Sequence, residues 1–388
     1  MKTFKNFCQK LNMNIYFEKF QDNRIRPQIP ARDIAKTVVY MLPLMLKSLL
    51  QVDQWARRPS LRNLIESRRF MVCSDSTLQR VLPNFELEPL YDTLATLYQH
   101  ILSSGLGETK FPTQKKLRIA VVDGSGFGHM FASVVILAGK SAFPLDSQVF
   151  SKSGKELLYS REVLSRLTGK LGSSFCDILV GDGAYANRKD FRLCKEEYGC
   201  DLLVKSSEET LEVIQDAKGL LHSISSDIEV AKGIDTQRNV LYEARALQDF
   251  EWEKLPYSLK VCWVKEEKLK TAPGEEPVEE FYVITTRLDL TPEEMRSIAH
   301  SRWEIENNLF KRLNSLIKSK KVYTHNVSTL NTLLLLWLIG LNLLELFIHS
   351  LKKVNWQSLY GRVRITLKFI LDELHIGLVE LAPQGLSP

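Results

Sequence analysis

The stretch KKLRIAVVDGSGFG, residues 115–128, decides the fold expected for this chain. Its apolar run LRIAVV has the composition of a buried strand and ends at Asp123, which a glycine follows directly. Two further apolar runs follow after glycine-containing turns, FASVVILAG at 131–139 and FPLDSQVF at 143–150. The three runs together predict neighbouring strands in a meander.

Helical and strand-like segments alternate beyond this meander. Residues 156–172 and 188–199 have helical spacing. Residues 175–185 and 200–206 contain short apolar runs, and the first of these runs ends in Asp182 followed by glycine. The order predicts an α/β fold, a mixed sheet flanked by helices. Open sheets of this class commonly build sites at the carboxyl ends of strands, where Asp123 and Asp182 are expected.

The N-terminal segment is basic and predicted to be helical. Residues 1–80 hold 15 Lys or Arg against six Asp or Glu, although the net charge of the whole chain is only +6. This asymmetry indicates either a nucleic-acid-binding region or a solvated basic surface. Residues 32–58 have the apolar spacing of a helix, with a bend expected at Pro43.

A short helix is predicted after Ser74 or Asp75, either of which can act as its N-cap, and it ends before Pro83. Arg80 lies on this helix, and Arg68–Arg69 lie just upstream. A short capped helix with nearby arginines is similar to the part of a helix-turn-helix motif that contacts DNA. Arg80 is therefore a candidate DNA contact.

The length and composition of the chain favour a soluble protein of two or three domains. The chain has 388 residues, and its six scattered cysteines form no CxxC pair, so neither a zinc site nor a disulfide framework is expected. Met1–Lys10 is polar and predicts no secretory signal. The most apolar segment, Leu333–Ile348, contains Asn342 and Glu345, which favours a buried helix over a membrane span. A cytoplasmic protein without membrane contact is expected.

The pattern changes at about residue 206 to strand-like runs separated by polar loops. These runs are RNVLYEARALQDFEW at 238–252, SLKVCWVKEE at 258–267 and EEFYVITTR at 279–287. They predict an inserted β-rich unit. A helix is expected to follow, with Thr291 as its cap and Pro292 at its first position.

This later helix carries an unusual charge within HSRWEIENNLFKRLNSL, residues 300–316. With about 100° of turn per residue, Arg302 and Glu306 fall in the middle of the apolar face, whereas Glu304 falls on the opposite side. A buried carboxylate is costly unless it is paired or binds a metal. Two interpretations stay open: an internal Arg302–Glu306 ion pair, or a functional carboxylate at Glu306.

Asp123, Asp182 and Glu306 together suit hard divalent cations, because Mg²⁺ and Mn²⁺ prefer oxygen ligands. Two such ions can activate an attacking oxygen and stabilise a leaving oxygen in phosphoryl transfer. The three acids are therefore the candidate catalytic residues and metal ligands. Arg302 could orient the Glu306 carboxylate or contact a phosphate.

At this point the chain resembles the DDE transposases of bacterial insertion sequences, in the cut-and-paste branch with a β-strand insertion before the third acid. The motifs that carry the resemblance are VVDGS around Asp123, VGDGAY around Asp182 and RWEIEN with Arg302 and Glu306. The acids are separated by 59 and 124 residues, and the second separation is long enough to hold the insertion. The family pattern also has a Tyr and a Lys where this chain has Ala299 and Leu313.

The resemblance implies an RNase H-like core, two Mg²⁺ ions (Mn²⁺ can substitute) and a homodimer on paired transposon ends. It implies hydrolytic nicking of double-stranded DNA at terminal inverted repeats, then attack by the 3′-hydroxyl, in this branch commonly through a hairpin. Further candidate contacts to DNA or phosphate are Arg302, Lys311, Arg312, Arg80 and Tyr185. For Tyr185 a packing role is the preferred interpretation, and the basic residues can equally form a solvated face.

Five regions are expected on these grounds. They are a helical DNA-end-binding region at 1–112, the first part of the core at 113–205, a β-rich insertion at 206–288, the rest of the core at 289–350 and a helical tail at 351–388. Two alternatives remain: a nuclease with the same site but no strand transfer, and a non-catalytic DNA-binding protein derived from a transposase.

Overall fold

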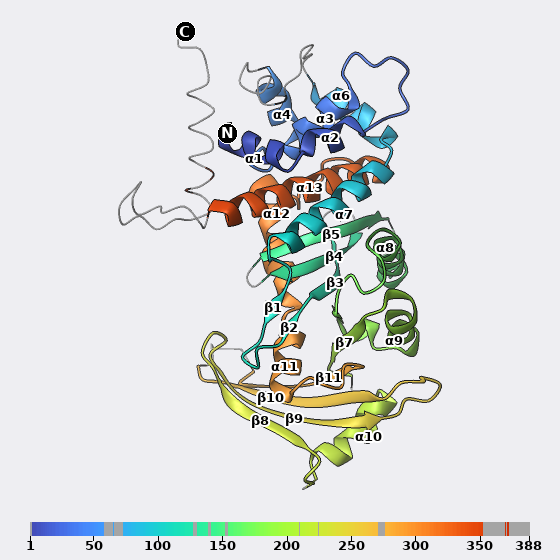
Figure 1. Ribbon diagram of the computed structural model, residues 1–388, viewed down its shortest axis with the longest axis vertical. Coiled ribbons are helices and arrows are strands. Elements are labelled where there is room, and N and C mark those ends of the chain that lie inside the picture. The colour runs from blue at the N-terminus through green and yellow to red at the C-terminus, as the bar shows by residue number, and fades with distance from the viewer. Residues whose placement is uncertain are drawn as a thin grey trace.

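The computed structural model describes residues 2–57, 65, 73–126, 130–138, 141–151, 154–208, 210–223, 225–270, 276–351, 369 and 371. Within them the protein is a mixed α/β structure with one large sheet flanked by helices, as the sequence predicts (Figure 1). The predicted tail at 351–388 and the arginines Arg68–Arg69 fall almost entirely outside these residues.

Helices dominate the N-terminal part, as predicted. They are α1 (Lys2–Lys10), α2 (Met13–Glu18), α3 (Ala31–Val39), α4 (Leu49–Ala56), α6 (Asp75–Val81) and α7 (Glu88–Ser103). The single bent helix expected across Pro43 is wrong, because α3 ends at Val39 and α4 begins only at Leu49. The predicted cap is confirmed: Ser74 accepts a hydrogen bond from the N–H of Thr77 at the start of α6.

The predicted meander and the helices and strands after it are present. The elements are β1 (Thr109–Lys110), β2 (Lys116–Leu117), β3 (Ile119–Gly126), β4 (Met130–Ala138), β5 (Ser141–Phe150), α8 (Glu156–Leu171), β6 (Ile178–Gly181), α9 (Arg188–Leu193) and β7 (Asp201–Ser206). Strands β3, β4 and β5 pair antiparallel, whereas β3, β6 and β7 run parallel. Parallel pairing buries β6 on both faces, which explains its continuous apolar run.

The strands predicted at 206–288 also form, but they extend the same sheet. After α10 (Glu212–Leu221) come β8 (Glu229–Asp235), β9 (Val240–Phe250), β10 (Leu259–Lys268) and β11 (Val278–Thr285). Strand β11 pairs antiparallel with β7, so the order is β5-β4-β3-β6-β7-β11-β10-β9-β8. The β-rich segment is therefore hydrogen-bonded to the first part of the sheet, and lies at its far end in Figure 1.

The chain then returns along the sheet through α11 (Pro292–His300), the π-helix η4 (Ile305–Phe310) and α12 (Lys311–Ile317) to α13 (Val327–Leu351). Among the described helices, α13 is long and apolar enough to cross a membrane, but 89% of its most apolar window is buried inside the protein. It packs against β5, α7 and α3 and lies between the sheet and the N-terminal helices (Figure 1). The prediction of a buried core helix is thus confirmed.

Candidate active site

Asp182 directly follows β6, and Asp123 lies on the neighbouring parallel strand β3, just beyond the part that pairs with β6. The strand expected to end at Asp123 continues to Gly126, paired with β4. Strands β3 and β6 pair with Val121 opposite Val180, and each acid lies two residues beyond its valine. The shared register brings both carboxyl groups to the same edge of the sheet. Asp123 Oδ1 accepts a 2.9 Å hydrogen bond from the N–H of Gly124, which fixes the orientation of its carboxylate.

Asp182 is held by the turn that follows β6. Its Oδ1 accepts a 2.9 Å hydrogen bond from the N–H of Ala184, so that Asp182 caps the 3₁₀ turn Gly183–Tyr185. Tyr185 is buried beneath this turn, packs where a side chain at Gly181 would otherwise lie, and donates a 2.7 Å hydrogen bond to Ser160. The preferred packing role of Tyr185 is confirmed.

Arg302 supplies the positive charge next to this pair. Its Nη1 lies 2.8 Å from Oδ2 of Asp123. The Arg302 side chain is 25% exposed and that of Asp123 is 14% exposed, so the ion pair lies at a shallow depth. The Arg302–Glu306 pair that the sequence left open does not form; Arg302 is bonded to the first acid instead.

Burial raises the pKa of Asp123 to about 6, Arg302 acts in the opposite direction, and the negative charge of Asp182 adds to the rise. The charge of Asp182 is therefore close enough to oppose the ionisation of Asp123. Like charges held close together in a partly buried place are costly unless a cation balances them, which is why such pairs often mark functional sites.

Glu156 is a third acid at this site, and sequence reasoning missed it. It is the first residue of α8, which packs on β3 and β4. A Cβ built on Gly124 would overlap the Glu156 carboxyl group, so this carboxyl group lies directly against the backbone after Asp123. Burial raises the pKa of Glu156, and the charges of Asp123 and Asp182 raise it further.

Glu306, by contrast, is not gathered with the other acids. It is exposed to solvent, and its side chain has no hydrogen bond or ion pair to any residue that the structure describes. The expectation that Glu306 faces inward and Glu304 outward is therefore wrong. Glu304 is partly buried, hydrogen-bonds Asn308 and lines a cavity of about 220 Å³.

The prediction for Glu306 and Glu304 failed because the helix is interrupted. Helix α11 ends at His300, a turn follows at Ser301–Arg302, and Ile305–Phe310 is a π-helix. A π-helix bonds each residue to the fifth one along, so a phase calculated at 100° per residue no longer holds. The predicted apolar face is nevertheless buried throughout: Met295, Ile298, Ala299, Ile305, Leu309, Phe310, Leu313, Leu316 and Ile317.

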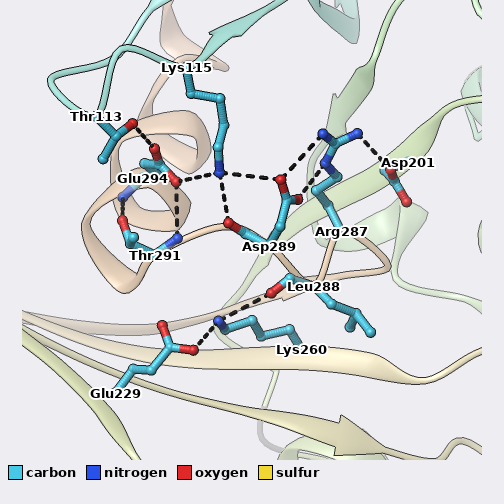
Figure 2. A network of polar contacts seen from close by, with 10 residues as sticks. All are labelled: Thr113, Lys115, Asp201, Glu229, Lys260, Arg287, Leu288, Asp289, Thr291 and Glu294. Atoms are coloured by element: carbon cyan, nitrogen blue, oxygen red, sulfur yellow. Dashed lines mark hydrogen bonds and ion pairs between the residues drawn. The ribbon is translucent and has the colours of Figure 1, made fainter.

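A polar network fixes the start of α11 and so positions the Arg302 segment (Figure 2). The predicted cap is confirmed as a reciprocal capping box between Thr291 and Glu294. Glu294 also accepts hydrogen bonds from Thr113 at 2.5 Å and from Lys115 at 3.2 Å. Lys115 reaches Asp289 as well, at 3.3 Å, so the loop before β2 is tied to the helix start.

The same network joins the first strands to the later ones. Arg287 pairs with Asp289 at 2.6 Å and with Asp201 of β7 at 3.6 Å. Lys260 of β10, only 2% exposed, pairs with Glu229 at 2.5 Å and donates to the carbonyl of Leu288 (Figure 2). The segment between β11 and α11 is therefore bonded to both parts of the sheet.

The other predicted contacts lie away from the acids or have protein partners. Lys311 is exposed and hydrogen-bonds Asn307 at 2.6 Å, whereas Arg312 pairs with the buried Glu345 of α13 at 2.6 Å. Arg80 is exposed in the last turn of α6. Lys311 and Arg80 are thus accessible, while Arg312 has a structural partner.

Among the described residues, no group of three or more His, Cys, Asp or Glu side chains is arranged so that it could hold a metal ion as it stands. In comparisons with known proteins, no family model matches the chain. No curated protein matches it significantly either.

Proposed function

We propose that the protein is a metal-dependent DNA transposase of the DDE type. The observation that carries the proposal is the placement of Asp123 and Asp182 in one register on β3 and β6, with Arg302 bonded to Asp123. Neighbouring carboxylates suit a cation, and a nearby guanidinium suits a phosphate. Phosphoryl transfer on a polyanion such as DNA needs both a bound cation and a positive group that contacts the phosphate.

The topology supports an RNase H-like core. The order β5-β4-β3-β6-β7 places the central strand β3 beside a reversed strand, β4, and a parallel strand, β6. Asp123 and Asp182 come from the adjacent strands β3 and β6 of this order. The strands β8–β11 then follow before the helical segment with Arg302, in the chain order that the resemblance implies.

The donor set fits Mg²⁺ or Mn²⁺, because carboxylate oxygens gather here without nitrogen or sulfur ligands. Asp123 and Asp182 would hold the ion, and Glu306 would join them only after the segment Ser301–Phe310 moves. Bound divalent ions would polarise the phosphate and lower the pKa of an attacking hydroxyl. A second ion is part of the proposal by resemblance.

The chain's own groups would bind and align DNA. Arg302 would exchange its bond to Asp123 for a phosphate oxygen once a cation neutralises the acid. The exposed Lys311 and Arg80 would contact the DNA backbone, with the N-terminal helices on a transposon end. The proposed reaction is water attack on one strand, then attack by the freed 3′-hydroxyl on the opposite strand or target. A homodimer on paired ends and a cytoplasmic, nucleoid-associated location belong to the proposal.

The test is Mg²⁺-dependent cleavage of DNA carrying the inverted repeats that flank the coding region. Wild type is compared with Asp182→Asn and Glu306→Gln, and joining of the 3′-hydroxyl to target DNA is scored separately. We expect wild type to cut and join, and both variants to lose cutting. Full cleavage by both variants contradicts the site. If wild type cuts DNA but does not join the ends, the nuclease alternative is favoured. If it binds the ends specifically but does not cut them, the non-catalytic DNA-binding alternative is favoured.

A further inference from the structure

The outer strands of the sheet have one face turned away from the rest of the protein. Strands β8, β9, β10 and β11 pair antiparallel, so residues opposite one another across them share a face. On the inner face, Glu266 of β10 is hydrogen-bonded to Arg296 and His300 of α11. On the outer face, α10 packs at one end, where the ring of its C-cap residue His222 lies 4.9 Å from that of Trp263. Figure 1 shows α10 and α11 on opposite sides of these strands.

Two neighbouring rows of side chains cross this outer face beyond α10. The first row takes one residue from each of β8, β9, β10 and β11 in turn and alternates in charge: Lys232, Glu243, Lys265 and Glu280. The second row is largely apolar: Ile234, Leu241, Glu267 and Val278. Ile234 is 61% exposed and Leu241 40%. Single exposed apolar residues are normal, whereas neighbouring ones beside polar residues often mark an interaction site.

The order of the charges is its own complement. Turned end for end, a row that reads positive, negative, positive, negative reads negative, positive, negative, positive. Two copies packed face to face about a two-fold axis parallel to the strands therefore bring Lys232 opposite Glu280 of the second copy. They also bring Glu243 opposite Lys265 of the second copy. Sheets that pack face to face keep their strand directions nearly aligned, as this axis does.

We infer that this face joins two copies of the chain in the absence of DNA. A two-fold interface pairs one surface patch with itself, and this patch has the self-complementary charges that such pairing needs. The same axis brings Ile234 against Val278 of the second copy, so the contact also buries apolar surface. The inference goes beyond the proposed function, because it needs neither a transposon end nor the cleavage site.

Other occupants fit this face less well. DNA is disfavoured because three of the five charged side chains in the two rows are acids, and a polyanion needs a positive surface. Edge-to-edge pairing of β8 with its own copy is also disfavoured. The register that pairs the whole strand puts Lys232 opposite Lys232 and Glu229 opposite Asp235, and like charges directly opposite are destabilising.

A simpler role for the charged row is the stabilisation of the sheet itself. Lys232 Nζ lies 3.0 Å from Glu243 Oε2 on the neighbouring strand, and such cross-strand ion pairs contribute to strand pairing. This role predicts that charge reversal lowers stability. It predicts no link between the charges of one chain and those of another, so association experiments separate the two roles.

The experiment measures self-association of the full-length protein without DNA by sedimentation equilibrium. We expect wild type to form a reversible dimer. Lys265→Glu should raise the dimer dissociation constant by about tenfold or more, because both Glu243–Lys265 contacts become pairs of like charges. Glu243→Lys should do the same. Lys254→Glu changes a 78% exposed lysine in the loop between β9 and β10, and this matched control should associate as wild type does.

A mixture of the two variants protects the test against loss of folding. A chain with Lys265→Glu and a chain with Glu243→Lys present opposite charges to each other at both contacts. The mixture should therefore form a mixed dimer about as readily as wild type dimerises, although each variant alone associates weakly. Variants that had only lost stability would not rescue each other.

The outcomes separate this inference from the proposed function. A wild type that stays monomeric at every concentration overturns the inference, whereas DNA cleavage is scored independently. Single variants that dimerise as wild type, or a mixture that does not recover, also overturn it. If Lys265→Glu weakens DNA binding with unchanged self-association, the face belongs to DNA and the inference is wrong. If the mixture recovers but wild type cuts no DNA, the inference stands and the proposed function fails.

Discussion

Arg302 Nη1 donates a 2.8 Å hydrogen bond to Oδ2 of Asp123, joining two residues 179 positions apart in the chain. One partner ends the first apolar run of the sheet, and the other follows the helix that comes after the whole β-rich segment. The bond shows that α11 returns the chain to the edge of the sheet where Asp182 also lies. In the absence of a bound cation, Arg302 neutralises part of the acidic charge.

The first prediction concerns this pair. Arg302→Ala should reduce Mg²⁺-dependent DNA cleavage by about a hundredfold or more, as removal of a group that stabilises developing charge typically does. Arg302→Lys should recover only part of the activity, because an ammonium cannot make the same bidentate contacts. Cleavage rates under single-turnover conditions give the comparison.

An exposed arginine elsewhere provides the control for this prediction. Arg192 of α9 donates to the carbonyl of Lys254 and lies outside the acidic cluster. Arg192→Ala should cleave at the wild-type rate. Cleavage by Arg302→Ala that matches the control would mean that the ion pair with Asp123 is only structural.

The second prediction separates stability from DNA binding at Arg312. This residue pairs with Glu345, whose side chain is 3% exposed within the apolar helix α13. Arg312→Ala should lower the free energy of unfolding by about 1–3 kcal/mol, because it removes an ion-pair partner from a buried carboxylate. Replacing both residues by methionine should restore most of that loss.

Urea unfolding measures both Arg312 variants, and DNA binding is titrated on folded protein. A residue that served DNA alone would give the opposite result: unchanged unfolding of Arg312→Ala together with weaker binding.

The third prediction is a pH dependence at the start of α11. Burial alone would raise the pKa of Glu294, but hydrogen bonds from Thr113, the N–H of Thr291 and Lys115 outweigh it and hold the pKa below its usual value. A depressed carboxyl pKa stabilises the fold above the unfolded-state pKa, and this contribution is lost as the pH falls through the folded-state value. The Glu294→Gln variant should therefore have a lower free energy of unfolding than wild type at pH 7. On acidification, its free energy of unfolding should fall by less than that of wild type.

Urea unfolding at pH 7 and at about pH 3, below the ordinary pKa of Glu, tests this expectation. Glu293→Gln on the same helical turn is the control, since the Glu293 side chain takes no part in the capping box. Equal losses of stability on acidification for wild type and Glu294→Gln would contradict the assigned interactions.

Sequence patterns were sufficient to predict the strands and the helix cap, because these features depend on local composition. The runs ending at Asp123 and Asp182 became neighbouring parallel strands, because a strand buried on both faces needs an unbroken apolar run. The capping box at Thr291 was likewise foreseeable from Thr-Pro-Glu-Glu, since a cap is a contact within one turn.

Features that depend on tertiary packing were not foreseeable in this way. The phase of Glu306 failed because the chain changes from α-helix to π-helix at Ile305, and nothing in the local pattern indicates that change. Glu156 was missed because its contact with Gly124 depends on how α8 packs against β3. A glycine after a strand-end acid was the available signal, but it is equally typical of a turn.

The last prediction uses two helical glycines that differ only in their surroundings. A Cβ added at Gly340 of α13 would lie 2.7 Å from the carbonyl oxygen of Val39 and 3.1 Å from Leu42, whereas one added at Gly169 of α8 would meet nothing within 4 Å. Gly169→Ala should stabilise the protein by about 0.5–1 kcal/mol, since alanine is the better helix former. Gly340→Ala should destabilise it by about 1–3 kcal/mol, because α3 and α13 must move apart. Urea unfolding of the two variants gives shifts of opposite sign if α13 packs directly against the backbone of α3, and shifts of the same sign if it does not.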